Sequence, residues 1–139
     1  DLKMTRFWFE MTEAINFVEQ SFSLMRGGEI FVPKIPSIRI ISLAKALDSN
    51  YKIKIIGKRP GEKLHEVMCP MDESEKVIEF KKYFVISPSS IFGKILNYNY
   101  FNSLKGEKGK KVSNDFEYHS GNNKHFLNVG EIKLLNRKY

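Results

Sequence analysis

Apolar residues recur along this chain at spacings that predict helices. Between Met11 and Met25 they follow three- and four-residue steps, which places them on one face of a helix. Gly27-Gly28 ends that helix. The segment 37–47 carries a second helical stripe, formed by Ile40, Leu43, Ala44 and Leu47. The pattern therefore predicts two amphipathic helices in the first third of the chain.

Other apolar runs have the shorter pattern of strands. Residues 29–32 form a short run, and Pro33 and Pro36 prevent it from continuing as a central strand. Residues 51–55 alternate polar and apolar positions, which predicts a half-buried strand.

The second half of the chain contains signals for a hairpin and a final helix. Strands are expected at 76–80 and 83–87, joined by Lys81-Lys82 as a hairpin. Asn128 and Glu131 have the spacing of a capping box, which predicts a terminal helix. Strands together with helices indicate the α/β class.

The chain divides into three segments on pattern alone. Residues 1–87 carry the regular patterns, residues 88–111 show no dependable period, and residues 112–139 contain a strand or turn and the last helix. Within the middle segment, the Lys/Gly-rich run 105–111 has nothing to bury and is read as a solvated loop.

Composition places the chain among ordinary globular proteins. It has 139 residues, 42% of them hydrophobic and 28% charged, which is outside the range of disordered sequences. No apolar stretch approaches the roughly 18 residues of a membrane span. The single cysteine, Cys69, excludes an internal disulfide and a cysteine-based zinc site, so a reducing, cytoplasmic location is expected.

Several common kinds of catalytic or binding site are not expected. The three histidines stand at spacings that do not match any familiar metal motif. No glycine-rich turn for a dinucleotide is visible, and Glu62 stands where a phosphate loop beginning at Gly57 needs its second glycine. His65 beside Glu66 is either a general base or a structural residue, and the sequence leaves both open.

The segment 58–63 contains the residues of a type II turn, with Pro60 and Gly61 at its centre. The guanidinium of Arg59 carries N–H donors whose spacing suits two oxygens of a phosphate. The carboxylate of Glu62 can accept hydrogen bonds from two sugar hydroxyls. These two side chains are therefore candidates for holding a nucleotide's diphosphate and ribose. The alternative is that Arg59 and Glu62 only pair with each other on the surface.

A second candidate lies near the start of the chain, where Arg6 precedes three aromatic residues, 7–9. If Phe7 and Phe9 point into a core and Trp8 lies across them, Arg6 is held at the rim and can meet an anion. The alternative is that Arg6 stacks on Trp8 for packing alone.

Three stretches of the sequence carry a resemblance to a known family. They are Met4-Thr5-Arg6-Phe7-Trp8, the run from Gly27 to Ser37, and the run from Gly57 to Glu66. In this order they resemble the C-terminal part of the inverting UDP-N-acetylglucosamine 4,6-dehydratases. These are CapD-like polysaccharide-biosynthesis enzymes of the extended short-chain dehydrogenase/reductase superfamily. The resemblance spans residues 1–87 and resumes weakly from Asp115 through the final helix.

This resemblance implies an α/β substrate-binding part that lacks the N-terminal Rossmann nucleotide-binding motif. It assigns residues 1–87 to the UDP-sugar, with Arg6 and Arg59 on the diphosphate and Glu62 on the uridine ribose. It assigns no catalytic residue and no metal ligand to this chain. Lys34 belongs to the same signature, but no step of the chemistry requires it.

The family oxidises the sugar at C4 with a bound nicotinamide, eliminates water across C5 and C6, and returns the hydride to C6. Its Tyr/Lys pair lies in the N-terminal portion, and no Tyr in this chain has a Lys four residues later. The expected whole enzyme is a UDP-N-acetylglucosamine 4,6-dehydratase or a UDP-sugar 4-epimerase of surface or capsular polysaccharide biosynthesis. The chain alone is expected to be inactive.

The resemblance also implies partners for the chain. They are a UDP-sugar, a missing N-terminal domain that binds NADP or NAD, and further copies of the enzyme in a homo-oligomer when complete. No membrane and no nucleic acid are expected among them.

Two other readings remain open. A small basic nucleic-acid-binding module fits the net charge of +7. However, 9 Lys+Arg against 4 Asp+Glu fall in residues 91–139, and no aromatic residue interrupts the lysine run to stack on a base. A truncated gene product without activity is the third reading.

Overall fold

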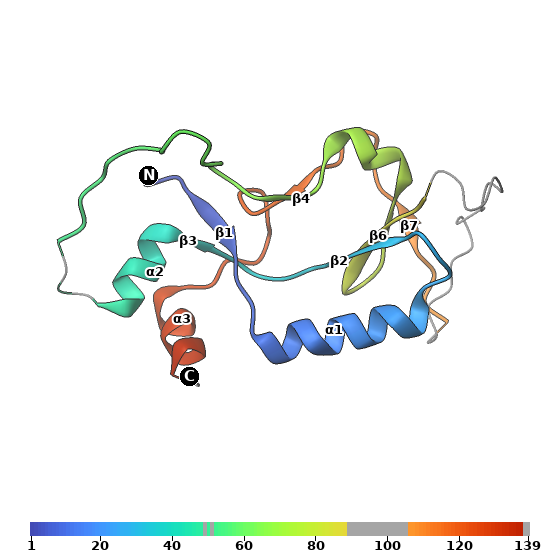
Figure 1. Ribbon diagram of the computed structural model, residues 1–139, viewed down its shortest axis with the longest axis horizontal. Coiled ribbons are helices and arrows are strands. Elements are labelled where there is room, and N and C mark those ends of the chain that lie inside the picture. The colour runs from blue at the N-terminus through green and yellow to red at the C-terminus, as the bar shows by residue number, and fades with distance from the viewer. Residues whose placement is uncertain (49, 51, 89–105, 138–139) are drawn as a thin grey trace. The chain divides into compact units, whose positions relative to one another are not determined.

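The computed structural model describes residues 1–48, 50, 52–88 and 106–137 (Figure 1). Its contacts divide the chain into two compact units. The first unit comprises Asp1–Glu10, Ile35–Val67 and His119–Tyr139, and the second comprises Met11–Lys34 and Met68–Tyr118. These units interleave along the sequence, unlike the contiguous segments 1–87, 88–111 and 112–139. Because residues 89–105 lie outside the description, that contiguous division remains a prediction.

The first unit is built from a small sheet and two helices. Strands β1 (Thr5–Phe7) and β3 (Ser37–Arg39) pair antiparallel, and helices α2 (Ile40–Leu47) and α3 (Val129–Asn136) belong to the same unit. Its core consists of buried Ile38, Ala46 and Ile132, against which Trp8, Leu43, Leu127 and Val129 pack. The Asn128–Glu131 capping box at the start of α3 is present, so this prediction is confirmed.

Trp8 is partly buried. It packs against the core of the first unit, while Phe9 is 40% exposed. The condition that Phe9 points into a core is therefore not met.

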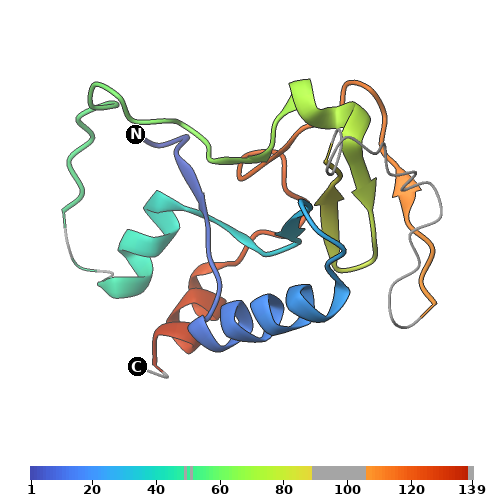
Figure 2. The ribbon, with the colours of Figure 1, turned by 45° about the vertical axis from the view of Figure 1, so that its right-hand side comes forward.

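The second unit contains a four-stranded sheet and helix α1 (Met11–Leu24). The strands are β2 (Ile30–Pro33), β5 (Val77–Glu79), β6 (Tyr83–Ile86) and β7 (Lys110–Lys111), in the order β2-β6-β5-β7. Strand β2 lies at the sheet edge, where Pro33 is tolerated. The predicted hairpin is confirmed, since β5 and β6 pair antiparallel (Figure 2).

Helix α1 contacts this sheet through a narrow set of side chains. Leu24 belongs to the buried cluster with Ile78, Phe80, Tyr83 and Val85, and Phe17 and Phe31 pack against it. The helix is confirmed, but the apolar stripe that predicted it faces outward. Ala14 is half-buried, but the other members are each at least 50% exposed: Met11, Ile15, Val18, Phe22 and Met25.

Three predicted elements differ from the structure. Residues 37–39 form β3, and helix α2 begins only at Ile40, because pairing with β1 holds that stretch extended. Residues 52–59 have no regular structure, and residues 52–55 are exposed, so the predicted strand at 51–55 was wrong for the described residues 52–55. Lys110–Lys111 pair with β5 as a strand, where a solvated loop was expected.

Further short elements are present, of which η1 and β4 were not predicted and β8 falls where a strand or turn was expected. The 3₁₀ helix η1 spans Met71–Lys76 in the second unit. Strands β4 (Val67–Cys69) and β8 (Tyr118–His119) lie where the chain passes from one unit to the other. Burial raises the pKa of the Cys69 thiol to about 12, which makes it an inert packing group.

Candidate functional site

The turn at residues 59–62 has the predicted geometry. The Glu62 backbone N–H donates to the Arg59 carbonyl at 3.1 Å, and Gly61 has a φ of 82°. A positive φ at the second central position defines a type II turn and favours glycine there. The Glu62 carboxylate also accepts the Arg59 backbone N–H, at 2.9 Å from Oε2. One main-chain hydrogen bond and one side-chain hydrogen bond therefore join the first and last residues of the turn.

The side chain of Arg59 is exposed on this closed turn. Among the described residues, no hydrogen bond or ion pair of its guanidinium is recorded, and no ion pair joins it to Glu62. Glu62 is half-buried, and its Oε1 accepts no hydrogen bond within the described part of the chain. The pairing of the two side chains with each other is thus not observed, and both retain hydrogen-bonding capacity.

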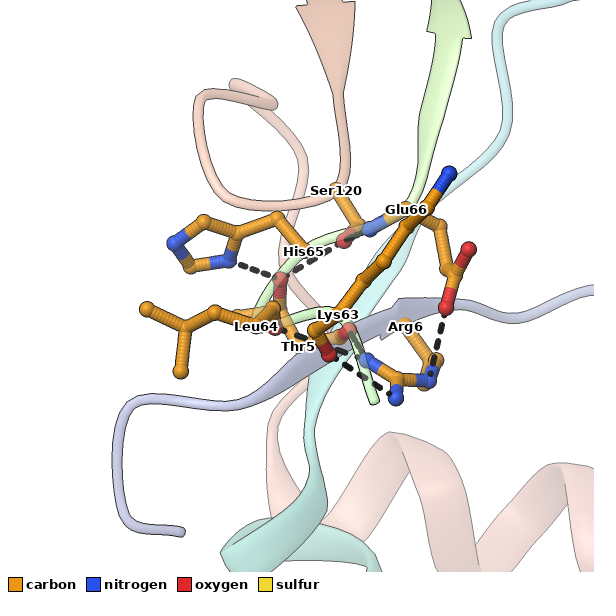
Figure 3. Close-up of polar contacts among 7 residues, drawn as sticks. All are labelled: Thr5, Arg6, Lys63, Leu64, His65, Glu66 and Ser120. Atoms are coloured by element: carbon orange, nitrogen blue, oxygen red, sulfur yellow. Dashed lines mark hydrogen bonds and ion pairs between the residues drawn. The ribbon is translucent and has the colours of Figure 1, made fainter. Parts of the chain in front are cut away.

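Arg6 is held more tightly than the sequence suggested. Its NH1 donates to the carbonyls of Thr5 at 2.6 Å and Leu64 at 3.4 Å, and its NH2 donates to that of Lys63 at 3.2 Å (Figure 3). Its Nε lies 3.3 Å from Glu66 Oε1. Through these hydrogen bonds and this ion pair, Arg6 links β1 to residues 63–66, which follow the turn.

Stacking of Arg6 on Trp8 is not observed. In the described ranges, the recorded cation–π contacts are those of Lys34 with Phe84 and of Arg39 with Phe126. The guanidinium of Arg6 instead meets main-chain oxygens, which accept charge-assisted hydrogen bonds.

His65 lies in a chain of hydroxyl groups that the sequence did not reveal. Its Nδ1 is 2.8 Å from Thr5 Oγ1, which is 2.7 Å from Ser120 Oγ. The Glu66 backbone N–H donates to the same serine oxygen at 2.9 Å. No sequence signal identifies this network, because Ser120 lies 115 positions from Thr5. Three separated stretches of the first unit are joined by it.

The ring of His65 also stacks on His119, with centroids 5.2 Å apart. Burial lowers the pKa of His65, and the nearby His119 and Arg6 lower it further. An imidazole that is bonded at Nδ1 and stacked on a second ring fits a structural residue. The geometry thus favours the structural reading of His65 over the general-base reading.

Lys34 contributes to packing in the second unit. Its Nζ lies 2.6 Å from Glu79 Oε1 and 4.6 Å from the centre of the Phe84 ring. These contacts give Lys34 a structural role, and neither contact requires Lys34 to take part in chemistry.

The described residues contain neither a cluster of metal-ligating side chains nor a membrane-spanning helix. No three His, Cys, Asp or Glu side chains there come together as metal ligands. None of the helices in the described ranges has the length and apolar character needed to cross a membrane.

The chain is similar in sequence to several known proteins. A UDP-N-acetylglucosamine 4,6-dehydratase (inverting) from Campylobacter jejuni subsp. jejuni serotype O:2 is 50% identical over 123 residues, covering 88% of this chain and 36% of that protein. The protein of the same description from serotype O:23/36 is 46% identical, covering 95% and 39%. A UDP-glucose 4-epimerase from Rickettsia canadensis is 36% identical, covering 95% and 38%.

A solved structure shares the fold. The X-ray structure of Pen from Bacillus thuringiensis matches with a TM-score of 0.72 and 26% identity, over 99% of this chain and 39% of that one. The chain thus spans less than two fifths of the length of these relatives. Residues 1–88 match the family described as polysaccharide biosynthesis protein, and on this match the chain belongs to that family.

Proposed function

We propose that this chain is the UDP-sugar-binding part of a larger nucleotide-sugar enzyme that serves surface or capsular polysaccharide biosynthesis. The whole enzyme is a UDP-N-acetylglucosamine 4,6-dehydratase or a UDP-sugar 4-epimerase, as the descriptions of the relatives suggest. The observation that carries the proposal is the exposed guanidinium of Arg59, which has no recorded partner among the described residues, on a turn that Glu62 closes.

In this proposal, Arg59 binds the diphosphate and Glu62 accepts hydrogen bonds from the uridine ribose. A type II turn presents both side chains from a short, constrained stretch, so little ordering is needed on binding. Arg6 adds a second positive group for the diphosphate. Its contacts with the carbonyls of Lys63 and Leu64 support the position of the segment that follows the turn.

These residues bind the uridine diphosphate part of the substrate and take no part in bond breaking. Contacts with the remote nucleotide supply binding energy that positions the sugar for chemistry elsewhere. The descriptions of the dehydratase and epimerase relatives name different sugars, but both sugars are linked to UDP. One segment that binds the uridine diphosphate group therefore serves either reaction.

NADP or NAD belongs, in this proposal, to a dinucleotide-binding part outside this chain. In the described ranges, the glycines with positive φ are 27, 28, 57, 61 and 106, and none lies between a strand and a following helix. The residues present do not fit a dinucleotide, so no step is assigned to it here. We place the whole enzyme in the cytoplasm as a homo-oligomer.

The test is an activity assay of a protein that joins this chain to a dinucleotide-binding part, with UDP-N-acetylglucosamine as substrate. Mass spectrometry that detects loss of one water supports the dehydratase. An isomer of unchanged mass supports the epimerase. Absence of both products with cofactor supplied contradicts the proposal. The chain alone is expected to give no product.

A further inference from the structure

One edge of the Arg6 guanidinium is occupied by a carboxylate. Nε and NH2 form the side of a guanidinium that offers two parallel N–H donors, the arrangement that matches two oxygens of a phosphate. In this structure, Nε lies 3.3 Å from Glu66 Oε1 and NH2 donates to the Lys63 carbonyl (Figure 3). An anionic oxygen of the chain itself thus occupies half of the phosphate-binding edge.

The remaining donors of Arg6 are largely engaged. NH1 donates to the carbonyls of Thr5 and Leu64. Those main-chain oxygens are held in place by β1 and by the hydrogen bond from the Thr5 N–H to the Leu64 carbonyl at 3.0 Å. The partner of Arg6 that can leave most easily is therefore the Glu66 side chain.

Glu66 is arranged so that its side chain can move while its backbone stays in place. Its N–H donates to Ser120 Oγ, which is part of the network with Thr5 and His65. Its side chain is 44% exposed, and its carboxylate pairs with Arg6 at the surface. A rotamer change is enough to free Nε without any change in the main chain.

We propose that the Glu66 carboxylate is an internal substitute for a phosphate oxygen at Arg6, displaced when a nucleoside diphosphate binds. This inference rests on the proposed function and identifies the residue that regulates access to its second arginine. While the site is empty, Glu66 keeps Arg6 in its binding orientation. When the ligand arrives, the more highly charged diphosphate replaces the carboxylate.

The carboxylate also sets the affinity of the site. It competes for Arg6 and repels an incoming anion, so ligands of low charge gain too little to displace it. Removing its charge while keeping its shape is expected to tighten binding of diphosphates. Because Arg6 and Glu66 are both partly exposed, the effect is modest, about two- to fivefold in Kd.

The test uses the full chain and titrates it with UDP, inorganic pyrophosphate and uridine, followed by NMR. Glu66→Gln is expected to lower the Kd for UDP and for pyrophosphate about two- to fivefold and to leave uridine unchanged. Glu75→Gln, which makes the same change in net charge at an exposed position of the second unit, is the matched control and is expected to change neither. In an Arg6→Lys background, which lacks the two-donor edge, Glu66→Gln is expected to lose most of its effect.

An unchanged or weaker affinity of Glu66→Gln for both anions overturns this inference. If Arg59→Ala still weakens UDP binding in the same series, the proposed function stands without it. Conversely, if Arg59→Ala has no effect on UDP while Glu66→Gln tightens pyrophosphate, the assignment of the turn fails and the role of Glu66 stands. An equal gain in the Glu75→Gln control reduces the effect to net charge and also overturns the inference.

Discussion

Gly121 lies directly against His65: a Cβ placed at Gly121 would be 2.5 Å from the His65 Nδ1. That nitrogen is the atom that bonds Thr5, so the glycine leaves room for the network that joins three stretches of the first unit. A side chain at this position has to displace the imidazole ring.

Replacing this glycine by alanine is therefore expected to destabilise the chain. Gly121→Ala should lower the free energy of unfolding by about 1–3 kcal/mol, because it crowds the histidine and breaks its bond to Thr5. Urea denaturation measures the change. In the double variant with His65→Ala the clash is absent, so the two costs should not add. Full additivity would show that the ring is not what Gly121 accommodates.

Acidification is expected to weaken the fold through His65. Its pKa in the folded chain lies below the ordinary value of 6.5, chiefly because of burial and then because of His119 and Arg6. Below pH 6.5 the unfolded chain binds a proton that the folded chain resists, so stability rises with pH in that window and falls as pH decreases from 6.5.

Urea denaturation between about pH 5 and about pH 7.5 tests this dependence. His65→Gln should reduce the slope of stability against pH, whereas His125→Gln, at an exposed position of the same unit, should leave it in place. The same slope in both variants as in the parent chain would contradict the assignment to His65.

The capping box of the terminal helix α3 is expected to contribute to the free energy of unfolding, independently of the candidate site. Asn128 Oδ1 accepts the Glu131 N–H at 3.0 Å, and the Glu131 carboxylate accepts the Asn128 N–H at 2.7 Å. Asn128→Ala removes one of these bonds and should cost about 1 kcal/mol. Asn128→Ser retains an N-cap acceptor and should restore most of it. Equal loss in both variants would mean that the cap contributes little.

Short sequence motifs correctly predicted the elements that are held together by residues close in the sequence. The capping box at Asn128 needs only residues within one turn, and the type II turn needs only Pro60 and Gly61 in sequence. The hairpin of β5 and β6 likewise joins neighbouring stretches. These features follow from the chain itself and were confirmed.

Features that depend on distant partners were not predictable in the same way. Alternation at 51–55 indicates a strand only if a second strand is available, and the described residues there remain exposed. The strand at Lys110–Lys111 depends on β5, and Gly109 permits it because any side chain there would meet Ile78 and Phe80. Charge alone made that stretch look like a solvated loop.

The candidate site shows the same division. Arg59 and Glu62 were found because both belong to one turn. The contacts of Arg6 with residues 63–66 join positions almost sixty residues apart, and no periodicity indicates them. The proposal for Glu66 rests on that pairing.

The central claim is that the turn bearing Arg59 binds the diphosphate of UDP, and a direct binding measurement tests it. The full chain is titrated with UDP at millimolar concentrations by NMR, as are the variants Arg59→Ala and Lys58→Ala, which remove the same charge from adjacent exposed residues. The account predicts that Arg59→Ala weakens binding about tenfold or more, since a charge-assisted hydrogen bond is lost, and that Lys58→Ala changes it less than about twofold. Equal, small effects of the two variants would contradict it.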